Sequence, residues 1–122
     1  MTLQELYQNI GADYEQAMRV LRMDKLLDKH IRKLVQNGVI DRVLEAGKSM
    51  EPNELFEAAH AMKGVCANLG LTPLADAASE LADEFRPGRE RRFTDAQVKE
   101  KLDQIAQRYQ KTAEEIQKYA NA

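Results

Sequence analysis

The chain of 122 residues has little of what builds disulfide frameworks, metal clusters or β-sheets. Its single cysteine, Cys66, excludes an internal disulfide and a zinc site made of several cysteines. Aromatic residues make up 6% of the chain and tryptophan is absent, so little in the composition favours strands. Only 6 glycines and 3 prolines interrupt a sequence in which Ala, Leu, Glu, Lys and Gln dominate. These features predict an all-α fold.

Two further absences limit the environment and the partners of the protein. No apolar run approaches the roughly 18 residues that span a bilayer, and the N-terminus lacks the basic and apolar segments of a secretory signal. The net charge is −2, which provides no global attraction to nucleic acid or to an anionic membrane. We therefore expect a cytoplasmic protein that binds neither nucleic acid nor membrane.

Apolar residues recur every three or four positions along most of the chain, which is the spacing of amphipathic helices. The segments predicted in this way are 3–10, 14–21, 24–35, 39–47, 52–70, 72–85 and 95–120. Long amphipathic helices joined by short polar turns pack most simply as an antiparallel four-helix bundle. We expect such a bundle as a single domain over residues 1–122, with short additional N-terminal helices across or beside it.

The segment 52–70, PNELFEAAHAMKGVCANLG, contains His60, and the geometry of a helix predicts where this side chain points. An α-helix turns about 100° per residue, and on that basis the side opposite His60 is a coherent apolar stripe. The residues of that stripe are Leu55, Ala58, Met62, Val65, Cys66 and Leu69. We therefore expect His60 to point away from the core, which argues against a buried histidine with a core partner.

The neighbours of His60 on the same face are those of a site that another protein approaches. Lys63, at i+3, is within reach of the imidazole and would lie beside any negative group attached to it. Gly64 costs about 1 kcal/mol relative to alanine inside a helix, and a glycine on an exposed helix face usually allows close approach of another group. Ala67, one turn further on, is also small. Together these residues predict a flat, open patch with one nucleophile and one cation.

Asn53 and Phe56 lie on the same side of this helix, nearer its start. Phe56 is equally compatible with two interpretations. In the first it belongs to an apolar docking surface beside His60, and in the second it packs against the short N-terminal helices.

The stretch AHAMKGVCANLGL, residues 59–71, resembles the signature of the histidine-containing phosphotransfer (HPt) domains of bacterial two-component phosphorelays. That signature is an AHxLKG core followed by small residues and a leucine-glycine pair, and Met62 replaces the usual leucine conservatively. The compatible helix pattern extends from about residue 12 to residue 120. The resemblance therefore covers most of the chain.

The resemblance implies that His60 accepts a phosphoryl group from an aspartyl-phosphate on a receiver domain, through Nε2, and passes it to another receiver. A histidine with an ordinary pKa near 6.5 is mostly neutral at cytoplasmic pH and has one nucleophilic ring nitrogen. Lys63 would stabilise the charge on the transferring oxygens. The partner-binding residues would be Asn53, Phe56, Gly64 and Ala67. Mg²⁺ would be bound by the receiver, so we expect neither a cofactor nor a metal on this chain.

The expected partners are response-regulator receiver domains, a hybrid histidine kinase, or both, and we expect the chain itself to be a monomer. It has no glycine-rich phosphate loop, so we expect a phosphoryl carrier without autonomous kinase activity rather than an enzyme. An alternative is a non-catalytic helical bundle that binds a receiver or a partner helix without phosphotransfer. A fragment of a larger sensor kinase is a third interpretation, although the initial methionine and the capped last helix favour a standalone protein.

The stretch RPGRERR, residues 86–92, contains four arginines and separates the last two predicted helices. It could attract an acidic partner, such as the aspartate-rich pocket of a receiver. The interpretation that we favour from the sequence is a solvated interhelical loop, because Glu90 dilutes the positive charge.

Overall fold

The computed structural model describes residues 1–121, which fold into helices and turns without any strand among them. The helices are α1 (Leu3–Asn9), α2 (Tyr14–Leu21), α3 (Asp24–Arg32), α4 (Val39–Ser49), α5 (Pro52–Asn68), α6 (Thr72–Glu84) and α7 (Asp95–Asn121). The all-α prediction is therefore confirmed.

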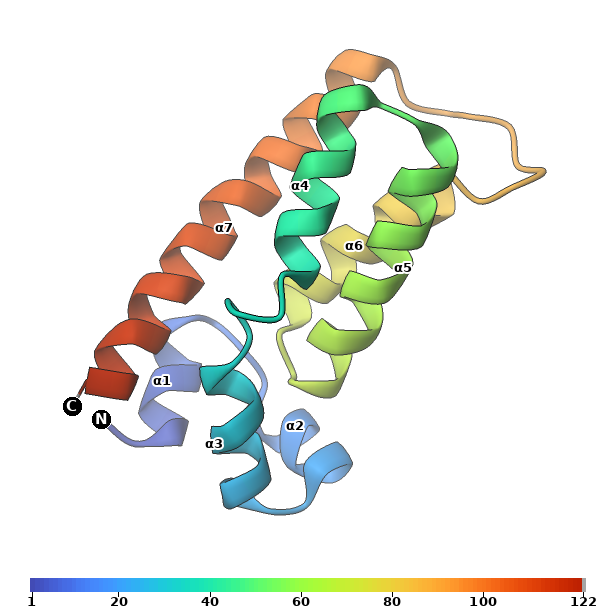
Figure 1. Ribbon diagram of the computed structural model, residues 1–122. Coiled ribbons are helices and arrows are strands. Elements are labelled where there is room, and N and C mark those ends of the chain that lie inside the picture. The colour runs from blue at the N-terminus through green and yellow to red at the C-terminus, as the bar shows by residue number, and fades with distance from the viewer. Residues whose placement is uncertain (122) are drawn as a thin grey trace.

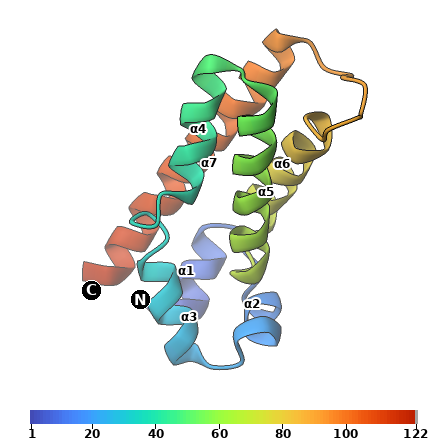
Figure 2. The ribbon, with the colours of Figure 1, turned by 45° about the vertical axis from the view of Figure 1, so that its right-hand side comes forward.

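The helices α4, α5, α6 and α7 form an antiparallel four-helix bundle (Figure 1). Within it, α5 packs against α4 and α6, and α7 closes the bundle by packing against both α4 and α6. The short helices α1, α2 and α3 lie at one end of this bundle, where α1 and α3 contact α7 and α2 contacts α5 (Figure 2). This arrangement confirms the predicted bundle with additional N-terminal helices.

The core side of α5 follows the predicted stripe with two differences. Leu55, Met62 and their neighbours in the stripe are buried, but Val65 is only half-buried, and Ala59, which was outside the stripe, is fully buried. Because α5 is flanked by α4 on one side and α6 on the other, its buried arc is broader than a single stripe. The turn of about 100° per residue predicts the direction of a helix face, but it does not predict where the neighbouring helices lie.

Two predicted helix ends are wrong. The third helix stops at Arg32, so Val35 falls in the following turn and is 40% exposed. The fourth helix continues through Gly47 to Ser49. Gly47 is buried, and a Cβ atom at this position would lie 2.5 Å from Cδ1 of Leu102 in α7. This glycine therefore allows α4 and α7 to approach closely, and it does not end the helix.

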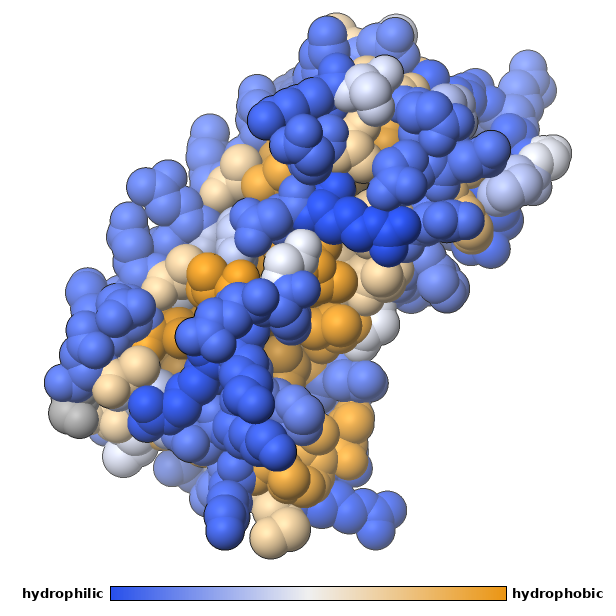
Figure 3. Space-filling view, viewed as in Figure 1, coloured by the Kyte–Doolittle hydropathy of each residue, from blue (hydrophilic) through white to orange (hydrophobic). Residues whose placement is uncertain are grey.

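The surface differs between the bundle and its N-terminal end (Figure 3). Charged and polar side chains cover most of the face over the upper halves of α4 and α5, whereas apolar side chains gather lower down, around α3. The large apolar side chains that remain exposed are Met1, Val20, Met23, Leu26 and Val35. None of the helices within residues 1–121 has the length and apolar character needed to cross a membrane.

Candidate functional site

His60 lies near the middle of α5, and the first turn of this helix is capped by local sequence. Pro52 occupies a position at the start of the helix, where its missing N–H removes no hydrogen bond. The carboxylate of Glu51 accepts hydrogen bonds from the amides of Asn53 (3.2 Å) and Glu54 (2.7 Å). A carboxylate at a helix N-terminus satisfies free amides and interacts favourably with the helix dipole.

The other end of α5 is closed by Gly70, whose φ of +68° lies in the left-handed region. The amides of Gly70 and Leu71 donate to the carbonyls of Ala67 (3.1 Å) and Cys66 (2.8 Å), which is a Schellman motif. The carbonyl of Gly70 also accepts the amide of Asp13 at 2.8 Å. A Cβ atom at Gly70 would lie 2.1 Å from the carbonyl oxygen of Asp13, so only glycine fits there.

Tyr7 connects α1 to this same end of α5. Its hydroxyl donates a hydrogen bond of 2.6 Å to the carbonyl of Leu69, and the side chain is 1% exposed. Burial raises the pKa of Tyr7 above its ordinary value, so the hydroxyl keeps its proton as a donor. The helix that carries His60 is thus fixed at both ends.

The imidazole of His60 is exposed and stacks on the ring of Phe56, one turn earlier in α5. The ring centroids are 5.9 Å apart and the planes meet at 25°. Phe56 is half-buried against the core, so it forms a supported surface that favours one orientation of the imidazole plane. The prediction that His60 points away from the core is confirmed.

The other predicted site residues of α5 are also at the surface. Asn53, Lys63, Gly64 and Ala67 are all exposed. A Cβ atom built at Gly64 would meet no atom within 4 Å, so no contact inside the protein requires a glycine at this position. The structure therefore places a small-residue surface beside His60 and leaves the roles of these residues in phosphotransfer as predictions.

Besides the core and His60, Phe56 contacts a residue of the loop that follows α6. The guanidinium carbon of Arg86 lies 5.7 Å from the centroid of the Phe56 ring, a cation–π arrangement. Arg86 also donates a hydrogen bond of 2.8 Å to the carboxylate of Asp83. The sequence alternatives for Phe56 did not include this contact, because a helical wheel of α5 contains no information about α6.

Two arginines of the loop bond to Asp83: the guanidinium of Arg86 donates to its carboxylate (2.8 Å) and that of Arg89 to its backbone carbonyl (3.3 Å). The hydrogen bond from Arg86 is the largest cause that lowers the pKa of Asp83, and the charges of Arg86, Arg89 and Lys63 lower it further. Arg86 and Arg89 thus lie against Asp83, with Arg86 also over Phe56, and Lys63 of α5 acts on the same carboxylate through its charge. Residues 86–92 are all exposed, in agreement with the solvated interhelical loop expected from the sequence.

The loop between α6 and α7 is held by Glu84, an acidic residue that is 1% exposed. Its carboxylate accepts hydrogen bonds from the amides of Arg92 (3.1 Å) and Phe93 (2.9 Å) and from the guanidinium of Arg91 (3.2 Å). Burial would raise the pKa of Glu84, but these hydrogen bonds outweigh it and lower the pKa below its usual value. The loop is an ordered part of the structure built around one buried carboxylate.

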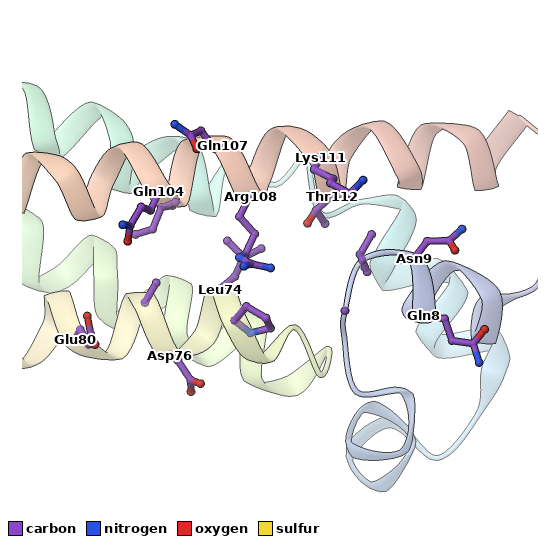
Figure 4. A pocket seen from close by; sticks show the side chains of 15 residues that line it. Gln8, Asn9, Leu74, Asp76, Glu80, Gln104, Gln107, Arg108, Lys111 and Thr112 are labelled. Carbon is purple, nitrogen blue, oxygen red and sulfur yellow. The ribbon is translucent and has the colours of Figure 1, made fainter.

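A separate groove of about 810 Å³ lies between α1, α6 and α7 (Figure 4). Its lining includes the buried apolar residues Leu74 and Ile105 and polar side chains such as Gln104, Arg108 and Lys111, which Figure 4 shows. None of the residues that line it belongs to α5. The groove is therefore distinct from the surface that carries His60.

Comparison with known proteins identifies the family of this chain. The family model described as "Hpt domain" matches residues 2–112, which include α1 to α6 and most of α7. Neither the curated proteins nor the solved structures provide a match. Hpt domains carry out histidine phosphotransfer in phosphorelays and interact with receiver domains and kinases. With the matched region containing His60 and every neighbour described above, the chain belongs to the Hpt domain family.

Proposed function

We propose that this protein is a phosphorelay intermediate in which His60 accepts a phosphoryl group from the aspartyl-phosphate of one receiver domain and passes it to another receiver. The observation that carries this proposal is the exposed imidazole of His60, with Lys63 and Gly64 on the same helix face, in a chain of the Hpt family. The chain has only two histidines, and His30 lies on α3, outside this face.

The reaction needs only the imidazole and a partner. Nε2 of a neutral His60 attacks the phosphorus of the aspartyl-phosphate, the N–P bond forms, and the P–O bond to the aspartate breaks. The aspartate leaves as a carboxylate, and the imidazole that carries the phosphoryl group keeps its proton on Nδ1. Attack by a carboxylate of the second receiver on the same phosphorus reverses these steps and regenerates neutral His60.

The surroundings of His60 support positioning and charge stabilisation, on which phosphoryl transfer chiefly depends. Phe56 stacks on the imidazole and restricts its rotation, which favours in-line approach. Lys63, one turn after His60, would stabilise negative charge on the transferring oxygens. Gly64, Ala67 and Asn53 would contact the receiver, because they are exposed and small or polar.

We place the remaining chemistry on the partner. In this proposal the receiver binds Mg²⁺ beside its aspartyl-phosphate, and this chain contributes no metal ligand and no cofactor. It acts as a carrier that does not phosphorylate itself from ATP, and a hybrid histidine kinase or a separate receiver supplies the phosphoryl group. We propose that it works as a monomer in the cytoplasm.

A reconstituted relay tests the proposal. A radiolabelled, phosphorylated receiver from the same organism is incubated with the wild-type chain, and then a second receiver is added. We expect an acid-labile, base-stable label that appears on the chain and then moves to the second receiver. His60→Gln should abolish the label, and His30→Gln is the matched control that should keep it. Label on His60→Gln, or none on the wild type with any receiver of that organism, would contradict the proposal.

A further inference from the structure

We propose that residues 86–93, here called the arginine loop, form the second wall of the receiver-docking surface, where Arg86 and Arg89 bind acidic side chains of the receiver. This inference rests on the proposed function and extends it to the choice of partner. It adds a role to this loop, whose residues 86–92 are exposed as the solvated-loop interpretation expects.

The first argument is position. Arg86 lies over one face of the Phe56 ring, and the same ring stacks on His60. Only one aromatic side chain therefore separates the guanidinium from the imidazole. A receiver that brings its aspartate to His60 must approach the surface that Arg86 occupies.

The second argument is charge. Around Asp83, the positive charges of Lys63, Arg86 and Arg89 act on a single carboxylate, although the chain as a whole has a net charge of −2. Arg86 and Arg89 thus add positive charge on the side of Phe56 that Arg86 covers. Local complementarity of this kind steers association and selects partners more than it raises the affinity.

The third argument is that Arg86 can exchange the carboxylate of Asp83 for a carboxylate of the partner. Its ion pair with Asp83 leaves the two side chains 50% and 42% exposed, and ion pairs with this exposure contribute little to stability. Replacing the carboxylate of Asp83 by a carboxylate of the partner therefore costs little. Arg91, by contrast, is paired with the fully buried side chain of Glu84 and serves to hold the loop.

The fourth argument is that the loop is preorganised. Glu84 fixes the amides of Arg92 and Phe93, and the ammonium of Lys101 lies 4.6 Å from the centroid of the Phe93 ring. A surface that is already ordered loses less conformational entropy when a partner binds. At the start of the loop the amide of Arg89 donates to the carbonyl of Arg86 (3.1 Å) and its guanidinium to the carbonyl of Asp83 (3.3 Å), so both arginines are also held in place.

The occupant that fits is a receiver domain and not nucleic acid. Arg86 and Arg89 belong to one short loop beside Phe56 and do not form an extended stripe of positive charge, and the net charge of the chain is −2. Mg²⁺ in proteins is bound mainly by carboxylates, so a partner that holds Mg²⁺ beside its aspartyl-phosphate exposes carboxylates at the point of contact. The receiver therefore brings its carboxylates and its phosphoryl group to the same part of this chain.

The test is the affinity for an unphosphorylated receiver, measured by titration at ionic strengths of about 0.01 M and about 1 M, where the Debye length falls from about 30 Å to about 3 Å. The double variant Arg86→Gln/Arg89→Gln should bind about three- to tenfold more weakly at the low ionic strength and show less salt dependence. The matched control, Arg108→Gln/Lys111→Gln, removes the same charge from the separate groove and should change the affinity less than about twofold. Asp83→Asn should bind more tightly than the wild type.

Equal losses in the two double variants, unchanged affinity in the arginine variant, or no tightening in Asp83→Asn would overturn the docking proposal. These outcomes are independent of phosphotransfer. A wild-type chain that binds receivers with the expected charge dependence but is never labelled at His60 contradicts the proposed function and supports the docking proposal. If His60 is labelled but binding does not depend on Arg86 and Arg89, the proposed function is supported and the docking proposal is contradicted.

Discussion

Replacing Gly64 separates the stability of α5 from its proposed use as a docking surface. Inside a helix, glycine is less favourable than alanine by about 0.5–1 kcal/mol. Because a Cβ atom at Gly64 meets nothing within 4 Å, Gly64→Ala should gain this full amount without any steric cost. An unfolding entropy of about 2.1 cal/mol/K per residue then predicts a rise in Tm of roughly 2–4 °C for a chain of this size.

The same substitution should impair phosphotransfer, since the added methyl group would occupy the space that we assign to the receiver. Gly64→Gln extends further from the helix and has a good helix propensity, so it should also be more stable than the wild type but transfer more slowly than Gly64→Ala. The assays are thermal unfolding and the rate of label transfer from a phosphorylated receiver at a subsaturating concentration. We expect transfer rates in the order glycine, alanine, glutamine.

Two results would refute this reasoning. A fall in Tm for Gly64→Ala would mean that the position is not open in the folded protein. Transfer by Gly64→Gln at the wild-type rate, with the expected gain in stability, would mean that no receiver approaches this part of α5. His30→Gln is again the control for a surface change outside the His60 face.

Three further predictions concern the frame that holds the site. Gly70→Ala should destabilise the protein by about 2–4 kcal/mol in urea unfolding, because alanine is strained at φ +68° and its Cβ would meet the backbone of Asp13; a change below about 0.5 kcal/mol would be inconsistent with this geometry. Burial raises the pKa of the Cys66 thiol to about 12, so alkylation at about pH 8 should be slow in the native protein and fast in urea, and equal rates would count against burial. The pKa of Glu84 is lower in the folded protein than its ordinary value of 4.5, so its contribution to stability is present above that value and is lost as the pH falls through the folded pKa. Glu84→Gln should therefore be less stable than the wild type near pH 7, with the difference shrinking near pH 3 in urea titrations, and a difference that does not depend on pH would contradict this.

Much of the fold and the direction of His60 follow from local patterns in the sequence. The spacing of Leu55, Met62 and Cys66 defines the core side of α5, and the pair Thr94 and Gln97, three residues apart, forms a capping box at the start of α7 with hydrogen bonds of 2.9 and 3.1 Å. These features depend on residues within one or two helical turns. Helix geometry is sufficient to predict them.

What the sequence did not reveal depends on contacts between distant elements. Gly47 lies inside α4, and its small size is needed because a Cβ atom there would meet Leu102 of α7, a residue far away in the chain. Arg86 reaches the His60 face only because the end of α6 lies beside Phe56, and Glu84 is buried only because the loop folds back over it. Neither pairing has a periodic signature in the sequence. The residues of the proposed acceptor helix were therefore easier to predict than the arginine loop next to it.

Locating the phosphoryl group on the chain tests the central claim most directly. After incubation with a phosphorylated receiver, the wild-type protein is digested at neutral to basic pH, where phosphohistidine persists, and the modified peptide is sequenced by tandem mass spectrometry. Our account predicts one phosphohistidine, at His60, in the peptide that contains AHAMKG. A phosphoryl group at His30, or on any residue outside α5, would contradict it.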